Sequence, residues 1–155
     1  THASMRGNSD SIYPADDDAT ISQQIAPATA VFVTSHIHVA YIRQIKDTLL
    51  VNTGSAGQLC DGDSRASYAQ VVWQHGQWRA DIVRLPYDRA ATEHAFFASG
   101  FMDETGPVAH LIFQVWKTAV PLLPSWRQQY MNAVIHGHIS LEQSVADFLR
   151  QCGLA

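Results

Sequence analysis

The first half of the chain alternates short apolar runs with turn residues, a pattern typical of β-strands. Ala30 to Thr34 is continuously apolar and β-branched, which predicts a strand buried on both faces. Four further runs are joined in pairs by turns at residues 45–47 and 75–76, which predicts two hairpins. The expected strands are 30–34, 39–44, 48–52, 67–74 and 77–85.

Beyond Pro86 the hydrophobic period changes to that of a helix. Val108, Leu111 and Val115 share one helical face, and the chain from about Trp126 to Ile135 continues the pattern up to Gly137. We expect Pro121 and Pro124 to interrupt the helices, and Ser140 to cap a last helix that runs to Cys152. An earlier helix is expected over 19–25, begun by the carboxylates of residues 16–18.

Composition and charge narrow the possible partners. The 155 residues are 46% hydrophobic and 15% charged with a net charge of −4, and the ten Lys and Arg are scattered, so we expect a packed core and no nucleic-acid duplex as partner. Cys60 and Cys152 lack metal or disulfide spacing and read as free thiols. No stretch of about 18 apolar residues is present, so we expect no membrane association and a cytoplasmic location. The start on Thr1 rather than Met suggests a chain cut from something longer.

The strongest local chemical signal is a pair of histidines directly after the first predicted strand. His36 and His38 flank Ile37, and two imidazoles at this spacing on a strand-end loop can face one cavity. Neutral imidazole is a good ligand for Zn, Mn, Fe or Ni. An isolated His-x-His pair is also compatible with two surface histidines. His136 and His138, which flank Gly137, are better explained as residues that end a helix.

Four segments of the chain resemble one protein family in order and spacing. Residues 35–38 are followed by Asn-Thr-Gly-Ser-Ala-Gly at 52–57, Asp-Gly-Asp-Ser-Arg-Ala-Ser-Tyr at 61–68 and Leu-Pro-Tyr-Asp at 85–88. The succession resembles the second half of bacterial and archaeal calcineurin-like metallophosphoesterases, which reads Gly-His-Thr-His, Asn-Pro-Gly-Ser-Val-Gly, Asp-Gly-Asp-Pro-Arg-Ala-Ser-Tyr and Val-Pro-Tyr-Asp. Residues 1–6 also resemble the family's His-Gly-Ser-Pro-Arg segment.

This resemblance implies a function and a set of site residues. It implies hydrolysis of phosphate mono- or diesters by two divalent metal ions, Mn, Fe, Ni or Zn, in the complete protein. His2 and His36 would ligate one ion and His38 the other. No catalytic acid or base is assigned. The residues expected to contact substrate are Arg6, Asn52, Ser55 and Arg65, although ordinary loop polarity explains Arg65 equally well.

Parts of the family pattern are absent or changed. The family's carboxylate and amide ligands come from its first half, which would precede Thr1, so we expect the chain alone to be inactive and to need that N-terminal half as a partner. Ser35, Ile37 and Thr53 replace the family's Gly, Thr and Pro, and Ser35 could shift the loop that holds the histidines. Two other interpretations stay open: a degenerate, non-catalytic interaction module, and a protein that binds one metal ion without hydrolytic activity.

The resemblance also implies a fold. We expect an α/β structure equivalent to the second half of a four-layer αββα sandwich, with a mainly antiparallel sheet and flanking helices over residues 1–105 and a helical extension over 106–155. One sheet of a two-sheet sandwich leaves an apolar face to be covered, so association with the missing half or as a homo-oligomer is expected.

Overall fold

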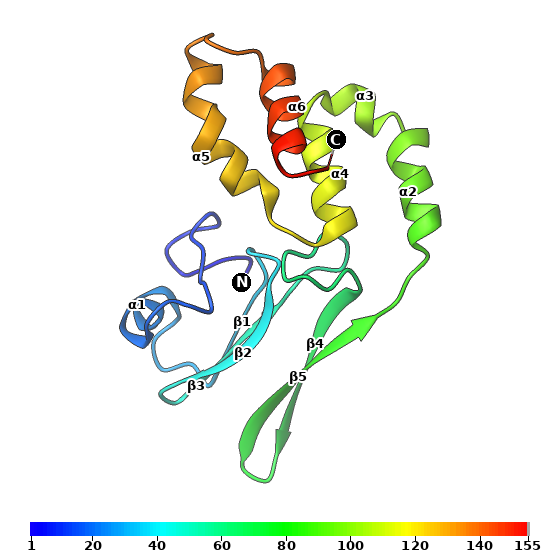
Figure 1. Ribbon diagram of the computed structural model, residues 1–155. Helices are drawn as coiled ribbons and strands as arrows, with labels where there is room; N and C mark the ends of the chain where they lie inside the picture. The colour runs from blue at the N-terminus through cyan, green and yellow to red at the C-terminus, as the bar shows by residue number, and fades with distance from the viewer. Residues whose placement is uncertain (155) are drawn as a thin grey trace. The chain divides into compact units, whose positions relative to one another are not determined.

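The chain forms a mixed α/β fold that divides into two compact units after Pro86. The computed structural model describes residues 1–154, and the first unit contains all the strands while the second is helical (Figure 1). The predicted boundary at residue 105 lies in the second unit, between α3 (Phe101–Thr105) and α4 (Val108–Thr118). The predicted boundary separates a family domain from an extension, and it stays a prediction.

The first unit is built on a three-stranded sheet of order β1-β3-β2. Its strands are β1 (Val31–Thr34), β2 (Ala40–Ile45) and β3 (Thr48–Thr53). β1 runs parallel to β3 with Val33 opposite Val51, and β2 runs antiparallel to β3 with Ile42 opposite the same Val51. Residues that stand opposite one another project to the same side of a sheet, so Val33, Val51 and Ile42 share one face.

A helix covers the other face of this sheet. α1 (Asp18–Gln24) begins at Asp17, whose carboxylate accepts a hydrogen bond from the amide of Thr20 as an N-cap. The core of this unit consists of Ile12, Ile21, Ile25, Phe32, Ile45 and Leu50, with Ala26 and Tyr41 at its edge. Burying such aliphatic side chains contributes roughly 1.5–3 kcal/mol each.

The prediction that β1 is buried on both faces is wrong. Phe32 and Thr34 are buried, but Val33 on the opposite face is 37% exposed. β1 lies at the edge of the sheet, and the strand buried on both faces is the central β3, in which Leu49, Leu50 and Val51 are all buried.

A long hairpin completes the first unit. β4 (Ala66–Gln74) and β5 (Gln77–Leu85) pair antiparallel in a two-stranded sheet. The turn residues His75 and Gly76 both have positive φ, as the favoured two-residue hairpin turns require. Trp73 and Trp78 stand opposite each other with ring centroids 5.3 Å apart, so they form an aromatic cross-strand pair.

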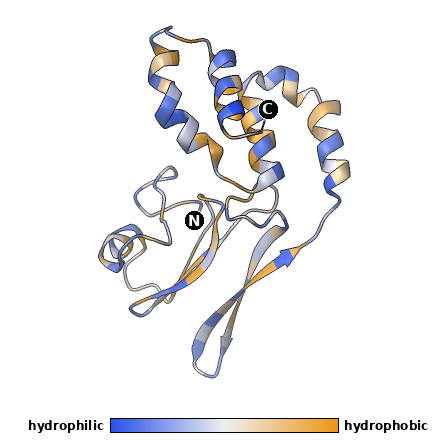
Figure 2. Cartoon of the chain, in the orientation of Figure 1, coloured by the Kyte–Doolittle hydropathy of each residue, from blue (hydrophilic) through white to orange (hydrophobic). Residues whose placement is uncertain are grey.

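The second unit contains only helices among its described residues. In addition to α3 and α4 it holds α2 (Arg89–Ala98), α5 (Leu122–Ile135) and α6 (Leu141–Gln151). α4 is largely apolar, whereas α6 carries both hydrophobic and hydrophilic residues (Figure 2). No helix formed by residues 1–154 has the length and apolar character needed to cross a membrane.

The start of α5 differs from the prediction. We expected a helix from about Trp126, after Pro124, but the helix begins at Leu122 and contains Pro124 in its first turn. The amides of the first turn have no partner within the helix, so the missing N–H of proline has no cost there. The expected cap of α6 is confirmed, because Ser140 Oγ accepts from the amide of Gln143.

Candidate metal centre

The N-terminal segment lies against the carboxyl end of β1 and brings His2 there. The carbonyl of His2 accepts hydrogen bonds from the amides of Ser35 and His36 at 3.1 and 2.9 Å. The hydroxyl of Thr34, which is buried, bonds the same carbonyl and that of Ala3. These bonds fix the backbone of His2 beside the loop that carries the other two candidate ligands.

His2 and His36 are in direct side-chain contact. Nε2 of His2 lies 2.9 Å from Nδ1 of His36, and the ring centroids are 4.9 Å apart in an edge-on arrangement. At this distance one imidazole nitrogen donates its proton to the lone pair of the other. The two nitrogen atoms therefore face each other across a hydrogen bond, which both would have to give up to present their lone pairs to a single ion.

His38 is held by the backbone of a tight turn. Its φ is 58°, its amide donates to the carbonyl of Ser35, and its carbonyl accepts from the amide of Cys60. Burial lowers the pKa of His38; the backbone of Gln58 acts in the opposite direction, and the nearby His36 and His2 lower it further. His38 is consequently held as neutral imidazole, the form that binds metals.

The complete ligand set of a metal centre is not found among the described residues. Within residues 1–154, no group of three or more His, Cys, Asp or Glu side chains converges in a geometry that would hold an ion. The donor chemistry of His2 and His36 fits two positions of one site. His38 lies on the same loop as His36, but it does not form a three-residue metal-binding group with His2 and His36.

The two acidic side chains that hold the surrounding loops are already engaged. Asp10 accepts from Ser4, Arg6 and Gln24. Asp61 accepts from Arg84 at 2.5 Å and from the amide of Ala40 at 3.0 Å. Burial alone would raise the pKa of Asp61, but these hydrogen bonds outweigh it and the pKa is lowered.

The residues expected to contact substrate mostly hold turns or surface ion pairs. Asn52 is buried, and its Oδ1 accepts from the amide of Gly54, while Ser55 Oγ accepts from the amides of Gly57 and Gln58. Arg6 pairs with Asp10, and Arg65 forms hydrogen bonds with Asp63. These hydrogen bonds hold the loops around the histidines, and a role in substrate binding stays a prediction for all four.

Two structural features near the histidines were not predicted from the sequence. The Asp61–Arg84 pair, with side chains 10% and 16% exposed, ties the loop after β3 to β5. The hydroxyl of Ser35 donates to the carbonyl of Gly54 at 2.6 Å, so the residue that replaces the family's glycine has a local partner, and its own φ is not positive. The positive φ falls instead on His38.

Comparison with known proteins does not assign the chain to a family. No protein-family model matches it, and no curated protein matches it either.

Proposed function

We propose that this chain supplies the histidine ligands of a dinuclear metallophosphoesterase centre, which hydrolyses phosphate mono- or diesters in the complete protein. The observation that carries the proposal is the contact between His2 and His36. The resemblance to calcineurin-like phosphoesterases assigns these two residues to one ion, and their ring nitrogens face each other across 34 positions of sequence.

The three histidines have separate roles in this proposal. His2 and His36 hold one divalent ion, and His38, kept neutral by burial, holds the second. Two such ions, Mn, Fe, Ni or Zn, supply a clamp on the phosphoryl oxygens and lower the pKa of a bound water. The remaining carboxylate and amide ligands belong to a segment outside residues 1–154, which is the partner the resemblance implies.

The face of the three-stranded sheet opposite α1 supports the proposed four-layer sandwich. On that face Val51 and Leu49 are buried and β4 and β5 contact β2 and β3, whereas Val33 and Ile42 are still 37% and 38% exposed. In an αββα sandwich a second sheet packs against this face. The first unit then corresponds to one sheet and one helical layer.

The exposed side chains of Val33 and Ile42 on this face favour a second candidate function, a non-catalytic interaction module. Apolar residues exposed near one another on a sheet mark an interaction site. In this alternative function the histidines only stabilise the fold, and the sheet face binds a partner.

Hydrolysis of p-nitrophenyl phosphate and its bis ester in the presence of Mn²⁺ separates the two functions. The protein to assay is the chain extended by the segment encoded upstream of Thr1, together with its His36→Ala variant. A His94→Ala variant is the control, because His94 lies on α2 in the second unit and is not one of the candidate ligands. The proposal expects hydrolysis that is lost only in His36→Ala. Hydrolysis unchanged in His36→Ala, or none with Mn²⁺, Ni²⁺ or Zn²⁺, would favour the interaction module.

A further inference from the structure

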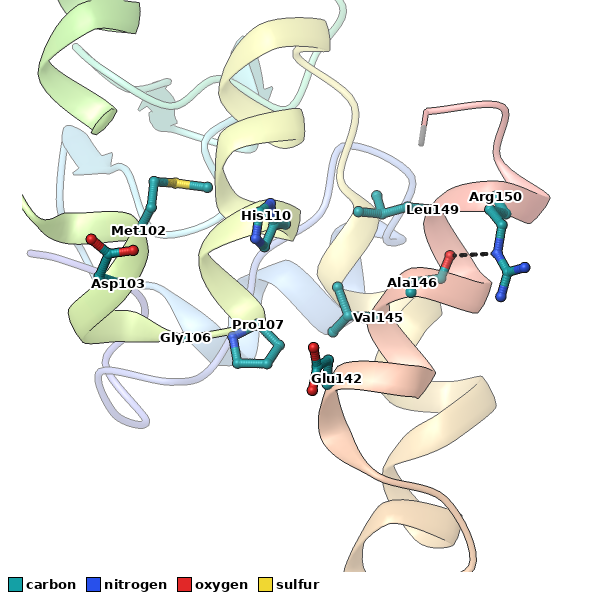
Figure 3. Close-up of a pocket in the computed structure, with 10 residues that line it drawn as sticks. All are labelled: Met102, Asp103, Gly106, Pro107, His110, Glu142, Val145, Ala146, Leu149 and Arg150. Atoms are coloured by element: carbon teal, nitrogen blue, oxygen red, sulfur yellow. Dashed lines mark hydrogen bonds between the residues drawn. The ribbon is translucent and has the colours of Figure 1, made fainter. Parts of the chain in front are cut away.

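A groove of about 620 Å³ opens in the second unit, between α3, α4 and α6 (Figure 3). This volume lies within the roughly 300–1,000 Å³ of sites that bind small molecules. The groove lies wholly within residues 102–150 and contains none of the candidate metal ligands.

The walls of the groove are mainly apolar. Val145 and Leu149, four residues apart on α6, are both buried and line one side. Met102 on α3 and Pro107 at the start of α4 line the opposite side (Figure 3). Such a surface accommodates the hydrocarbon part of a ligand, and it gains free energy when that part leaves water.

The available charge around the groove is negative. Asp103 and Glu142 lie on α3 and α6, and neither carboxylate has a hydrogen bond or ion pair with another described residue (Figure 3). Arg150 also lines the groove, but its guanidinium is already bonded to Asp147 and to the carbonyl of Ala146 (Figure 3). An anionic ligand would meet two carboxylates without a free cation to receive it.

We propose that this groove binds a small organic cation, with an apolar body packed against Val145 and Leu149 and an ammonium group paired with Glu142 or Asp103, the carboxylates that α6 and α3 place at the groove. Charge and shape select the ligand together: the apolar walls favour a hydrophobic body, and the two carboxylates favour a positive head group. His110, which also lines the groove, offers one further hydrogen-bonding group.

Three probes share one apolar body and differ in the charge of the head group: phenylbutylamine, phenylbutanol and phenylbutyrate. Comparing their affinities shows whether charge contributes to binding. Isothermal titration calorimetry on the full chain is expected to give an affinity for the amine about tenfold above that for the alcohol, with the carboxylate weakest. High salt should reduce the preference for the amine, because exposed charges are screened. Equal affinities for all three probes, or no binding at millimolar concentrations, would overturn the proposal.

Variants locate the binding. Asp103→Asn with Glu142→Gln is expected to abolish the preference for the amine while leaving the affinity for the alcohol unchanged. Glu104→Gln is the matched control, because Glu104 also lies in the first turn of α3 but does not line the groove. Ala146→Trp, at an exposed position of the groove wall, should block all three probes without removing a core side chain. Amine binding that survives both groove variants would place the site elsewhere and overturn the proposal.

Discussion

Nε2 of His2 lies 2.9 Å from Nδ1 of His36, although 34 positions separate the two residues in the chain. The contact depends on the carboxyl end of β1, where the amides of Ser35 and His36 and the hydroxyl of Thr34 all bond the carbonyl of His2. These hydrogen bonds fix the main chain of both histidines without a metal ion. Histidines that hold an ion are commonly oriented by such surrounding hydrogen bonds.

Replacing Gly54 by alanine should destabilise the first unit. Gly54 has a φ of +73°, and a Cβ there would lie 3.0 Å from Ala40 Cβ and Ser67 Oγ and 3.1 Å from Leu59 Cδ2. The left-handed backbone and the crowding together cost about 2–5 kcal/mol of unfolding free energy. Urea denaturation measures this loss.

Gly62→Ala is the matched control for Gly54. Its φ is +82°, but no atom lies within 4 Å of the added Cβ, so only the backbone cost of about 1–2 kcal/mol is expected. Equal losses in the two variants would show that crowding around Gly54 is unimportant.

Acid should weaken the first unit through Asp61. The folded-state pKa of Asp61 is lowered, so its contribution to stability is complete above the unfolded value near 3.8 and is lost as pH falls through the lower folded value. Asp61→Asn should remove this part of the pH dependence and also cost about 1–3 kcal/mol at neutral pH, because Arg84 loses its charged partner. Urea unfolding of both proteins at pH 7 and at several pH values below the unfolded value near 3.8 tests this. A pH dependence unchanged in the variant contradicts the assignment.

Tyr87→Phe should loosen the second unit. The hydroxyl of Tyr87 accepts from Trp116 Nε1 at 2.8 Å and from Arg89 at 3.3 Å, and Trp116 is buried. Removing this acceptor costs about 1–2 kcal/mol, because a buried donor loses its partner. Thermal unfolding is the measurement, with Tyr68→Phe on the exposed face of β4 as a control that should change little. A shift as large in the control would mean that the Trp116 bond contributes nothing.

The exposed apolar residues of the three-stranded sheet should drive association. Val33 and Ile42 flank the buried Val51 and are 37% and 38% exposed, so the chain is expected to self-associate as concentration rises. A double variant, Val33→Lys with Ile42→Lys, should shift sedimentation velocity profiles towards the monomer. Ile135→Lys, at an exposed position on α5, is the control. Association unaffected by the sheet variant would place the contact surface elsewhere.

Local structure was predictable wherever periodicity and turn chemistry agreed. The hairpin of β4 and β5, with His75 and Gly76 in its turn, appears at the expected residues. The burial of β1 was mispredicted because it depends on strand order, which an apolar run such as 30–34 does not encode. The start of α5 differs from the prediction because a proline within an apolar pattern predicts a helix break, although the first turn of a helix accepts proline.

The candidate site was only partly predictable. His36 and His38 lie two positions apart and form a local pattern, whereas only the family resemblance indicates His2, because no spacing rule links positions so far apart. The Asp61–Arg84 pair depends on how β5 aligns with the loop after β3, and no local pattern predicts it.

The measurement that tests the central claim most directly is NMR of the chain with labelled histidine rings during a titration with Mn²⁺. The eight histidines report together, so each serves as a control for the others. Because His2 and His36 are the proposed ligands of one ion, their ring signals should broaden first and together, followed by His38. The Mn²⁺ concentrations that do this should leave His75, His94, His110, His136 and His138 sharp. Uniform broadening of all the histidines, or broadening led by His136 and His138, would contradict a metal site at the end of β1.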